Sequence, residues 1–297
     1  MDKVVTIDPN EITTAQLHGY LLAAVAPRPV AFASTVDPDG NINLSPFSFF
    51  NVFSANPPIM IFSPARRGRD NTTKHTYENI KAVPETVINI VNYTMVEQTS
   101  LASTEYDRGV NEFQKAGFTE VASEKVKPPR VGEAPVSFEC VVDQVIELGD
   151  QGGAGNLIIS RVVLIHIQQE YLSGNGRIDT TELDLIGRMG GNWYCRASGQ
   201  ALFEIPKPQM SKGIGVDQLP VSVQNSRILT GNLLGRLGNT PKIPGKDEIE
   251  KVRSLPEVQH ILDQRDSGLR QDGLHSMAKD LLEAGETEKA LALLFIE

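Results

Sequence analysis

The chain has 297 residues, of which 40% are hydrophobic and 22% are charged, and no apolar run approaches the roughly 18 residues that a membrane span needs. Its formal net charge of −9 disfavours a general nucleic-acid binder, which relies on a basic face. Since the N-terminus also lacks an export signal, we expect a cytoplasmic protein without a membrane or nucleic-acid partner.

The first two thirds of the chain carry the pattern of short strands. Apolar and β-branched residues over 29–36 end at a turn sequence over 37–40, where Pro38 presets φ and Gly40 accepts positive φ, so a hairpin is predicted. Its return strand is expected over 41–53. After the break at Asn56-Pro57-Pro58, a strand buried on both faces is expected over 59–63. Further strands are predicted over 87–92, 138–148 and 156–168.

The glycine-rich segment over 149–155 invites comparison with a phosphate-binding loop. A dinucleotide-binding fingerprint needs its glycines to open a helix, whereas the residues over 157–163 continue as a strand. The segment is therefore interpreted as a hairpin turn.

Helical patterns are sparse before residue 203. One short helix is predicted over 77–83 and another over 94–102, with Thr94 as N-cap and Glu97 completing a capping box. Many short strands with few helices favour a barrel over a doubly wound sheet. Cys140 and Cys195 lie far apart without a neighbouring histidine cluster, so reduced thiols and no metal site are expected.

The pattern changes after Phe203. Pro206-Lys207-Pro208 resembles a linker, and helical periodicity follows it. An apolar stripe predicts a helix ended by Gly285, after which Thr287 can cap a second helix, and this hairpin is interpreted as packing. The stripe consists of Leu274, Met277, Ala278, Leu281 and Leu282. We therefore expect a β domain over 1–203 and a helical extension over 204–297.

Two polar clusters adjoin the predicted strands. Over 43–51, hydroxyl residues alternate with aromatic ones, and over 66–76 arginines, a lysine and hydroxyls crowd one loop. A flavin mononucleotide needs charge-assisted donors for its phosphate and a flat apolar seat for its ring, which these clusters offer. The basic loop can equally be a solvated surface turn, because runs of charge usually are.

Six motifs in one order resemble the flavin reductase-like, FMN-binding split-barrel family, which includes flavoredoxin-like proteins. They are Ala26-Pro27-Arg28-Pro29-Val30-Ala31, Ser34-Thr35, Asp39-Gly40, the residues over 43–50, Pro57-Pro58, and Lys74-His75-Thr76 with Asn79-Ile80. His75 replaces the acid of the family's usual Lys-Asp-Thr. Residues 188–194 are similar to the Arg-x-Gly-Gly-x-x-Tyr segment that closes the family's domain, so the resemblance covers about residues 10–200.

The resemblance implies a mainly β, antiparallel Greek-key split barrel that binds FMN, uses NADH or NADPH as co-substrate and forms a homodimer. The implied FMN contacts are Ser34, Asn43, Ser45, Phe47, Ser48, Phe49, Arg67, Thr73, Lys74, Thr76 and Arg188. The one catalytic candidate is His166, since members that reduce flavin can place a histidine against the nicotinamide. A core histidine that satisfies a backbone carbonyl is the alternative.

The function that the resemblance implies is NAD(P)H-dependent flavin reduction by hydride transfer to flavin N5. Two alternatives stay open at this point. One is an FMN-binding electron carrier that does not use nicotinamide directly, and the other is an interaction module with a vestigial flavin site.

Overall fold

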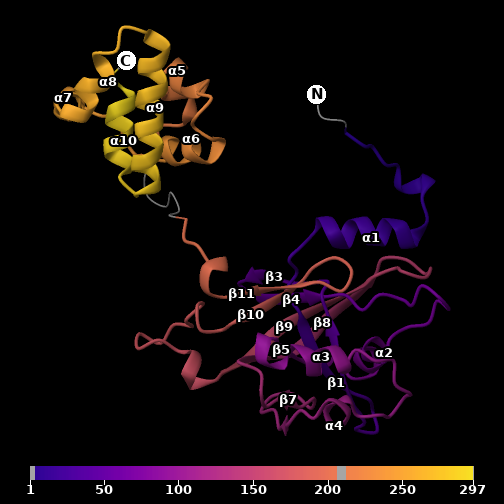
Figure 1. The fold of residues 1–297 in the computed structure, drawn as a ribbon. Helices are drawn as coiled ribbons and strands as arrows, with labels where there is room; N and C mark the ends of the chain where they lie inside the picture. The colour runs from indigo at the N-terminus through magenta and orange to yellow at the C-terminus, as the bar shows by residue number, and fades with distance from the viewer. Residues whose placement is uncertain (1–3, 206–211, 297) are drawn as a thin grey trace. The chain divides into compact units, whose positions relative to one another are not determined.

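The computed structural model describes residues 4–205 and 212–296. They divide into two compact units, Met1–Phe203 and Glu204–Glu297, which run from indigo to salmon and from orange to yellow in Figure 1. The Pro-Lys-Pro segment over 206–208, interpreted as a linker, lies outside the described residues.

The first unit is built on one antiparallel sheet of seven strands in the order β2-β1-β5-β8-β9-β4-β3. The prediction of a mainly β, antiparallel unit is therefore confirmed. The strands are β1 (Ala31–Val36), β2 (Ile42–Phe47), β3 (Phe50–Ala55), β4 (Pro58–Phe62), β5 (Glu85–Ile90), β8 (Val136–Glu147) and β9 (Asn156–Ile167).

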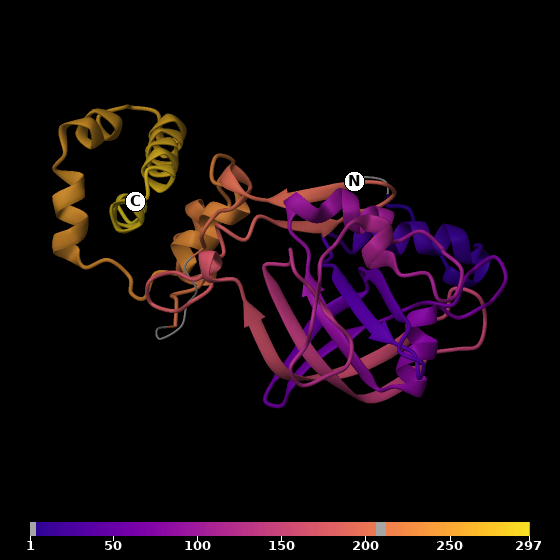
Figure 2. The same cartoon turned by 90° about the horizontal axis from the view of Figure 1, so that it is seen from below.

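The two edge strands of this sheet, β2 and β3, are joined by only Ser48 and Phe49. In a flat sheet of seven strands the edges would lie about 29 Å apart, at about 4.8 Å per spacing. The short connection spans at most about 11 Å. The sheet must therefore be rolled so that its edges meet at Ser48 and Phe49, and Figure 2 shows the strands curving around a shared interior. Full closure and a Greek-key connection remain predictions.

Two strand predictions need correction. The return strand expected over 41–53 is two strands, β2 and β3. The first pairs with β1 and the second with β4, and the chain passes from one edge of the sheet to the other at Ser48 and Phe49. The strand expected over 59–63 is β4, which is not buried on both faces: Met60 and Phe62 are buried and the residues between and before them are not. One face of β4 packs on the core, with Phe47, Ile88 and Ile158 among its neighbours there.

Short helices and two small hairpins complete the first unit. The glycine-rich segment over 149–155 connects the paired strands β8 and β9, as the hairpin interpretation predicts. The helices are α1 (Thr14–Ala24), α2 (His75–Ala82), α3 (Val96–Leu101) and α4 (Glu112–Ala116). The small hairpins pair β6 (Glu120–Val121) with β7 (Arg130–Val131), and β10 (Leu185–Arg188) with β11 (Tyr194–Ala197).

Two helix starts differ from expectation. Thr94 does not cap a helix, because it lies inside the 3₁₀ turn Tyr93–Met95 and its hydroxyl donates to Asn92 Oδ1 at 2.8 Å. Helix α1 was not predicted at all, although Thr13 and Gln16 form a capping box: the Gln16 N–H donates to Thr13 Oγ1 and the Thr13 N–H donates to Gln16 Oε1.

The second unit is helical. Its helices are α5 (Val221–Gln224), α6 (Gly231–Gly238), α7 (Lys246–Arg253), α8 (Pro256–Leu262), α9 (Ser267–Glu283) and α10 (Thr287–Leu294). The predicted hairpin is α9 and α10, turned by Gly285 at a φ of 84°. Thr287 begins α10 rather than capping it, and Glu286 is the N-cap residue. Within the described ranges, no helix is long and apolar enough to cross a membrane.

Candidate functional site

A cavity of about 290 Å³ lies beside the connection between β2 and β3, where the edges of the rolled sheet meet. Segments far apart in the sequence form its wall. They are α1 with His18 and Leu22, the segment Ser45 to Phe49, the loop after β4 with Ser63, Ala65 and Lys74, the end of β10 with Arg188, the turn after it with Met189 and Gly191, and the single residues Arg28 and Ser103.

A second, much smaller cavity of about 20 Å³ shares Ser45, Lys74 and Ser103 with the first. It extends the site toward the start of α2. Its other lining residues are Asn43, Arg67, His75, Thr76, Thr104, Glu105, Tyr106 and Glu112. Because the two cavities share these three residues, they are adjacent, and they make up the wide end and the narrow end of one candidate site.

Aromatic side chains line the wide end. Phe47 is buried and packs on Phe62, with ring centroids 5.4 Å apart, so its ring is fixed by the core. Phe49 is more exposed, and its ring meets His18 edge-on with centroids 6.4 Å apart. Both rings line the cavity and give it an apolar surface, of the kind that planar ligands use.

The wide end is also positively charged. Arg28, Lys74 and Arg188 line it, and none of its described lining residues is acidic. Arg28 is buried, and its guanidinium donates to the carbonyl oxygens of Leu22 at 2.6 Å and Met189 at 3.0 Å. Burial, and secondly the nearby Arg188, lower the pKa of Arg28. The cavity therefore suits a ligand that is electron-rich or anionic.

The narrow end holds a cluster of cations around one carboxylate. Glu105 Oε1 lies 2.9 Å from Arg67 Nε and 3.0 Å from Lys74 Nζ, and Oε2 lies 2.6 Å from Arg69 Nη2. The hydrogen bond from Lys74, followed by that from Arg67, lowers the pKa of Glu105 to about 2. Glu105 was not among the residues implied by the resemblance.

The start of α2 adds to this positive end. The helix begins at His75, directly after Lys74, and no side chain caps its first turn. Lys74, His75 and Thr76 all line the narrow cavity. The first turn of a helix leaves backbone N–H groups without helical partners and carries a partial positive charge, which favours an anion.

Most of the expected flavin contacts come together at this site. Ser45, Phe47, Ser48, Phe49, Lys74 and Arg188 line the wide end, and Asn43, Ser45, Arg67, Lys74 and Thr76 line the narrow end. Ser34 and Thr73 line neither cavity. The Ser34 hydroxyl donates to the Pro129 carbonyl at 2.5 Å, and the Thr73 hydroxyl donates to Glu78 Oε1 at 2.8 Å, so both serve local structure.

Asn43 and Thr76 are held in a buried hydrogen-bond network. The Thr76 hydroxyl donates to Asn43 Oδ1 at 2.7 Å, and Asn43 Nδ2 donates to Glu112 Oε1 at 2.8 Å. The other oxygen of Glu112 accepts the Leu44 N–H at 2.8 Å, and burial raises the pKa of Glu112. The network connects β2, α2 and α4 in the wall of the narrow end, which all three side chains line.

His166 lies outside both cavities. Its Nε2 is 2.7 Å from Oε1 of Glu139, a fully buried carboxylate that also accepts the backbone N–H groups of Glu124 and Lys125. The partner of His166 is thus a carboxylate, and not the backbone carbonyl that was expected for a core histidine. A contact between His166 and a nicotinamide stays a prediction.

Arg28 is one of several lining residues that sequence reasoning did not select. It was quoted within the motif Ala26-Pro27-Arg28-Pro29-Val30-Ala31 but was not assigned to the site. The signal available in the sequence was an arginine between two prolines in an otherwise apolar segment. An apolar segment is expected to be buried, and a guanidinium buried with it requires several acceptors around it, which marks a special position.

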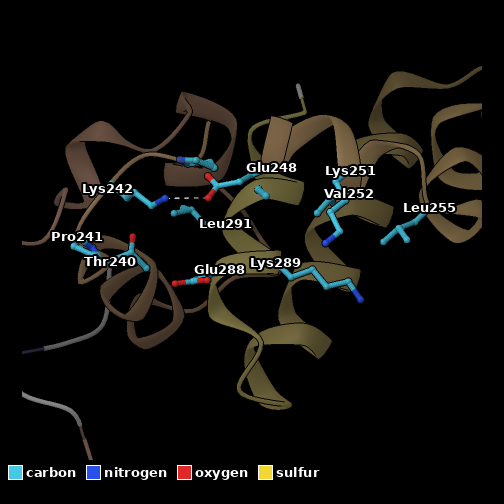
Figure 3. A pocket seen from close by; sticks show the side chains of 12 residues that line it. Thr240, Pro241, Lys242, Glu248, Lys251, Val252, Leu255, Glu288, Lys289 and Leu291 are labelled. Atoms are coloured by element: carbon cyan, nitrogen blue, oxygen red, sulfur yellow. Dashed lines mark hydrogen bonds and ion pairs between the residues drawn. The ribbon is translucent and has the colours of Figure 1, made fainter. Parts of the chain in front are cut away.

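The helical unit has a cavity of its own, about 430 Å³ in volume, between α7, α10 and the segment over 240–244 (Figure 3). Val252, Leu291 and Ala292 form its buried apolar side. Lys242 points toward Glu248 and pairs with it at 3.0 Å, and Lys289 pairs with Glu286 at 3.5 Å. None of the residues predicted to bind a cofactor lies there, so the cavity of the first unit is the candidate site.

Comparison with known proteins agrees with this choice of site. Residues 23–181 match the model of the flavin reductase like domain. An uncharacterized protein of Aquifex aeolicus is 36% identical over 189 residues, which are 64% of this chain and 94% of that protein.

Two solved structures extend the similarity to three dimensions. Nitrilotriacetate monooxygenase component B from Bacillus cereus is 31% identical with a TM-score of 0.64, over 69% of this chain and all of that one. A protein with a split barrel domain from Shewanella frigidimarina is 26% identical with a TM-score of 0.56, over 67% and 95% of the two chains. The family match over residues 23–181 contains the narrow end of the site and most of the wide end, whereas the helical unit lies outside it. The lining residues outside the match are His18, Leu22, Arg188, Met189 and Gly191.

Proposed function

This chain belongs to the flavin reductase-like family of flavin-related oxidoreductases, and we propose that it binds FMN and reduces it with NADH or NADPH. The observation that carries the proposal is that the two ends of the site adjoin and share Ser45, Lys74 and Ser103. An aromatic, positively charged cavity adjoins a cluster of cations at the start of a helix. An isoalloxazine ring and a terminal phosphate need those two surroundings side by side.

Each part of the site has a separate task in this proposal. Phe47 and Phe49 seat the ring, and the positive charges of Arg28 and Arg188 favour electron density on it. Arg67, Lys74 and the uncapped start of α2 hold the phosphate. A bound flavin would supply the redox chemistry as the acceptor of a hydride, so the task of this chain's own residues would be to orient it and to set the charge around it.

The proposed function is tested by identifying the bound flavin and then reducing it with a nicotinamide cofactor. Flavin released from the purified, reconstituted protein should be FMN by chromatography, because the narrow end offers cations for one terminal phosphate. The bound flavin should lose its yellow absorbance when NADH or NADPH is added without oxygen. Recovery of FAD alone would contradict the FMN assignment. A bound FMN that neither nucleotide bleaches would indicate an electron carrier instead.

We further propose that residues 1–203 form the flavin-binding domain and that two copies associate through it. No residue of α1 is buried, Tyr20 and Leu21 are exposed on it, and Val25 is exposed directly after it. The edge strand β3 exposes Val52 and Phe53. Exposed apolar groups on a sheet edge favour covering by another chain. Light scattering tests the proposal, and a monomer with full flavin affinity would contradict it.

A further inference from the structure

The narrow end of the site already contains an anion that belongs to the protein. Both carboxylate oxygens of Glu105 are engaged by cations: Oε1 by Arg67 and Lys74, and Oε2 by Arg69. These three cations come from the loop between β4 and α2, whereas Glu105 comes from the segment between α3 and α4. Two separate segments are therefore joined by an ion cluster at the place proposed for the phosphate.

With Glu105 in this position the narrow cavity measures about 20 Å³. That is about the space of one water molecule, and a phosphate group is larger. Glu105, Arg67 and Lys74 all line this cavity, so the carboxylate and a phosphate would compete for the same donors. A phosphate monoester carries about −1.5 to −2 charges at neutral pH, against −1 for a carboxylate, and suits three cations better.

The segment that carries Glu105 is held by surface contacts. None of residues 103–111 is buried, whereas Ala102 before it and Phe113 after it belong to the apolar core. Besides the Glu105 cluster, the segment has further side-chain contacts at the surface. Arg108 Nη1 lies 3.1 Å from Glu78 Oε2, Asn111 Nδ2 donates to Glu120 Oε1 at 2.8 Å, and Lys115 Nζ lies 5.6 Å from the centroid of the Tyr106 ring. Segments with few buried apolar contacts open locally at low cost, so Glu105 can leave the cluster while the sheet stays intact.

We propose that Glu105 is an internal competitor for the flavin phosphate, which binds to Arg67, Arg69 and Lys74 when the Glu105 carboxylate moves away. This inference rests on the proposed FMN site. Glu105 would then set how tightly phosphorylated flavins bind, and it would have no such effect on riboflavin, which lacks the phosphate.

The test compares FMN and riboflavin binding to the full-length wild type and to Glu105→Gln, by calorimetry or flavin fluorescence. Gln keeps the size of the side chain but removes the charge that attracts the three cations. We expect FMN to bind about tenfold or more tightly to the variant, with riboflavin affinity unchanged. The matched control is Asp143→Asn, which removes a carboxylate paired with Arg161 outside the site and changes the net charge equally.

A second measurement does not use flavin. Inorganic phosphate should raise the melting temperature of Glu105→Gln and of Glu105→Ala more than that of the wild type or of Asp143→Asn. Weaker or equal FMN binding to Glu105→Gln, while the wild type still prefers FMN to riboflavin, would overturn the inference and make Glu105 a positioning residue for the cations. Equal affinity for FMN and riboflavin in every variant would instead overturn the proposed phosphate site itself.

Discussion

Arg28 and Arg188 are joined through their backbones in both directions. The Arg28 N–H donates to the Arg188 carbonyl at 3.0 Å, and the Arg188 N–H donates to the Arg28 carbonyl at 2.8 Å. This pair fastens the β10–β11 hairpin to the residues that precede β1, and it places two guanidinium groups in one cavity wall. The two groups repel each other, so the surrounding contacts must hold them there.

Replacing Arg28 should destabilise the first unit, since its guanidinium satisfies carbonyl oxygens of α1 and of the β10–β11 turn. We expect Arg28→Met to lower the free energy of unfolding by about 1.5 to 3 kcal/mol. Arg188→Met is the matched control. Arg188→Met should lower the free energy of unfolding by less than Arg28→Met does, because the Arg188 side chain is only half-buried and donates to one carbonyl, that of Trp193. Urea unfolding measures both, and equal losses would contradict this assignment.

Lys74 should contribute to FMN affinity through its charge. Lys74→Ala removes a charge-assisted contact worth about 1.5 to 3 kcal/mol, so the dissociation constant should rise about tenfold or more. Lys81→Ala, which removes a lysine of α2 paired with Glu147 outside the site, should leave it unchanged. An unaltered dissociation constant for Lys74→Ala would move the phosphate away from this residue.

The stability that the Glu105 cluster contributes should depend on pH. The pKa of Glu105 is lowered from 4.5 to about 2 in the folded chain, so its contribution is present above about pH 4.5 and is lost as the pH falls through about 2. The melting temperature of Glu105→Gln should lie below that of the wild type at neutral pH. This difference should shrink between about pH 4.5 and 2, and a constant difference would contradict the pairing.

The two thiols should differ in reactivity. Cys140 is fully buried, and burial raises its pKa to about 12, whereas Cys195 is half-buried. Because the thiolate is the reactive form, iodoacetamide at neutral pH should label Cys195 in the folded protein and both thiols in urea. Peptide mass spectrometry identifies the labelled residue. Labelling of Cys140 without denaturant would show that β8 opens readily.

His166→Ala separates the two readings of this histidine. The variant leaves the buried Glu139 without its side-chain partner, so the free energy of unfolding should fall by about 1 to 3 kcal/mol. FMN affinity should not change, because His166 lines neither cavity. Stopped-flow reduction beside a thermal melt measures both effects. A selective change in the NADH or NADPH concentration dependence would place His166 at the nicotinamide.

Local pattern was sufficient for most strands and for part of the site. Alternation and turn residues locate β1, β5, β8 and β9, because strand periodicity and turn chemistry are local properties of the chain. The hydroxyl and aromatic residues from Ser45 to Phe49, and Lys74, could also be selected from the sequence. No glycine interrupts residues 42–55, however, so the sequence did not show that β2 and β3 lie on opposite edges of the sheet.

Tertiary structure decided which of these residues meet. The rolling of the sheet brings its two edges together at Ser48 and Phe49, and the backbone pairing of Arg28 with Arg188 places both side chains in the same wall. It also decided that Glu105 pairs with Lys74, a residue 31 positions away in another loop. Periodicity records which face of an element is buried, whereas ion pairs between exposed loops depend only on their proximity after folding. Such ion pairs therefore produce no periodic pattern in the sequence.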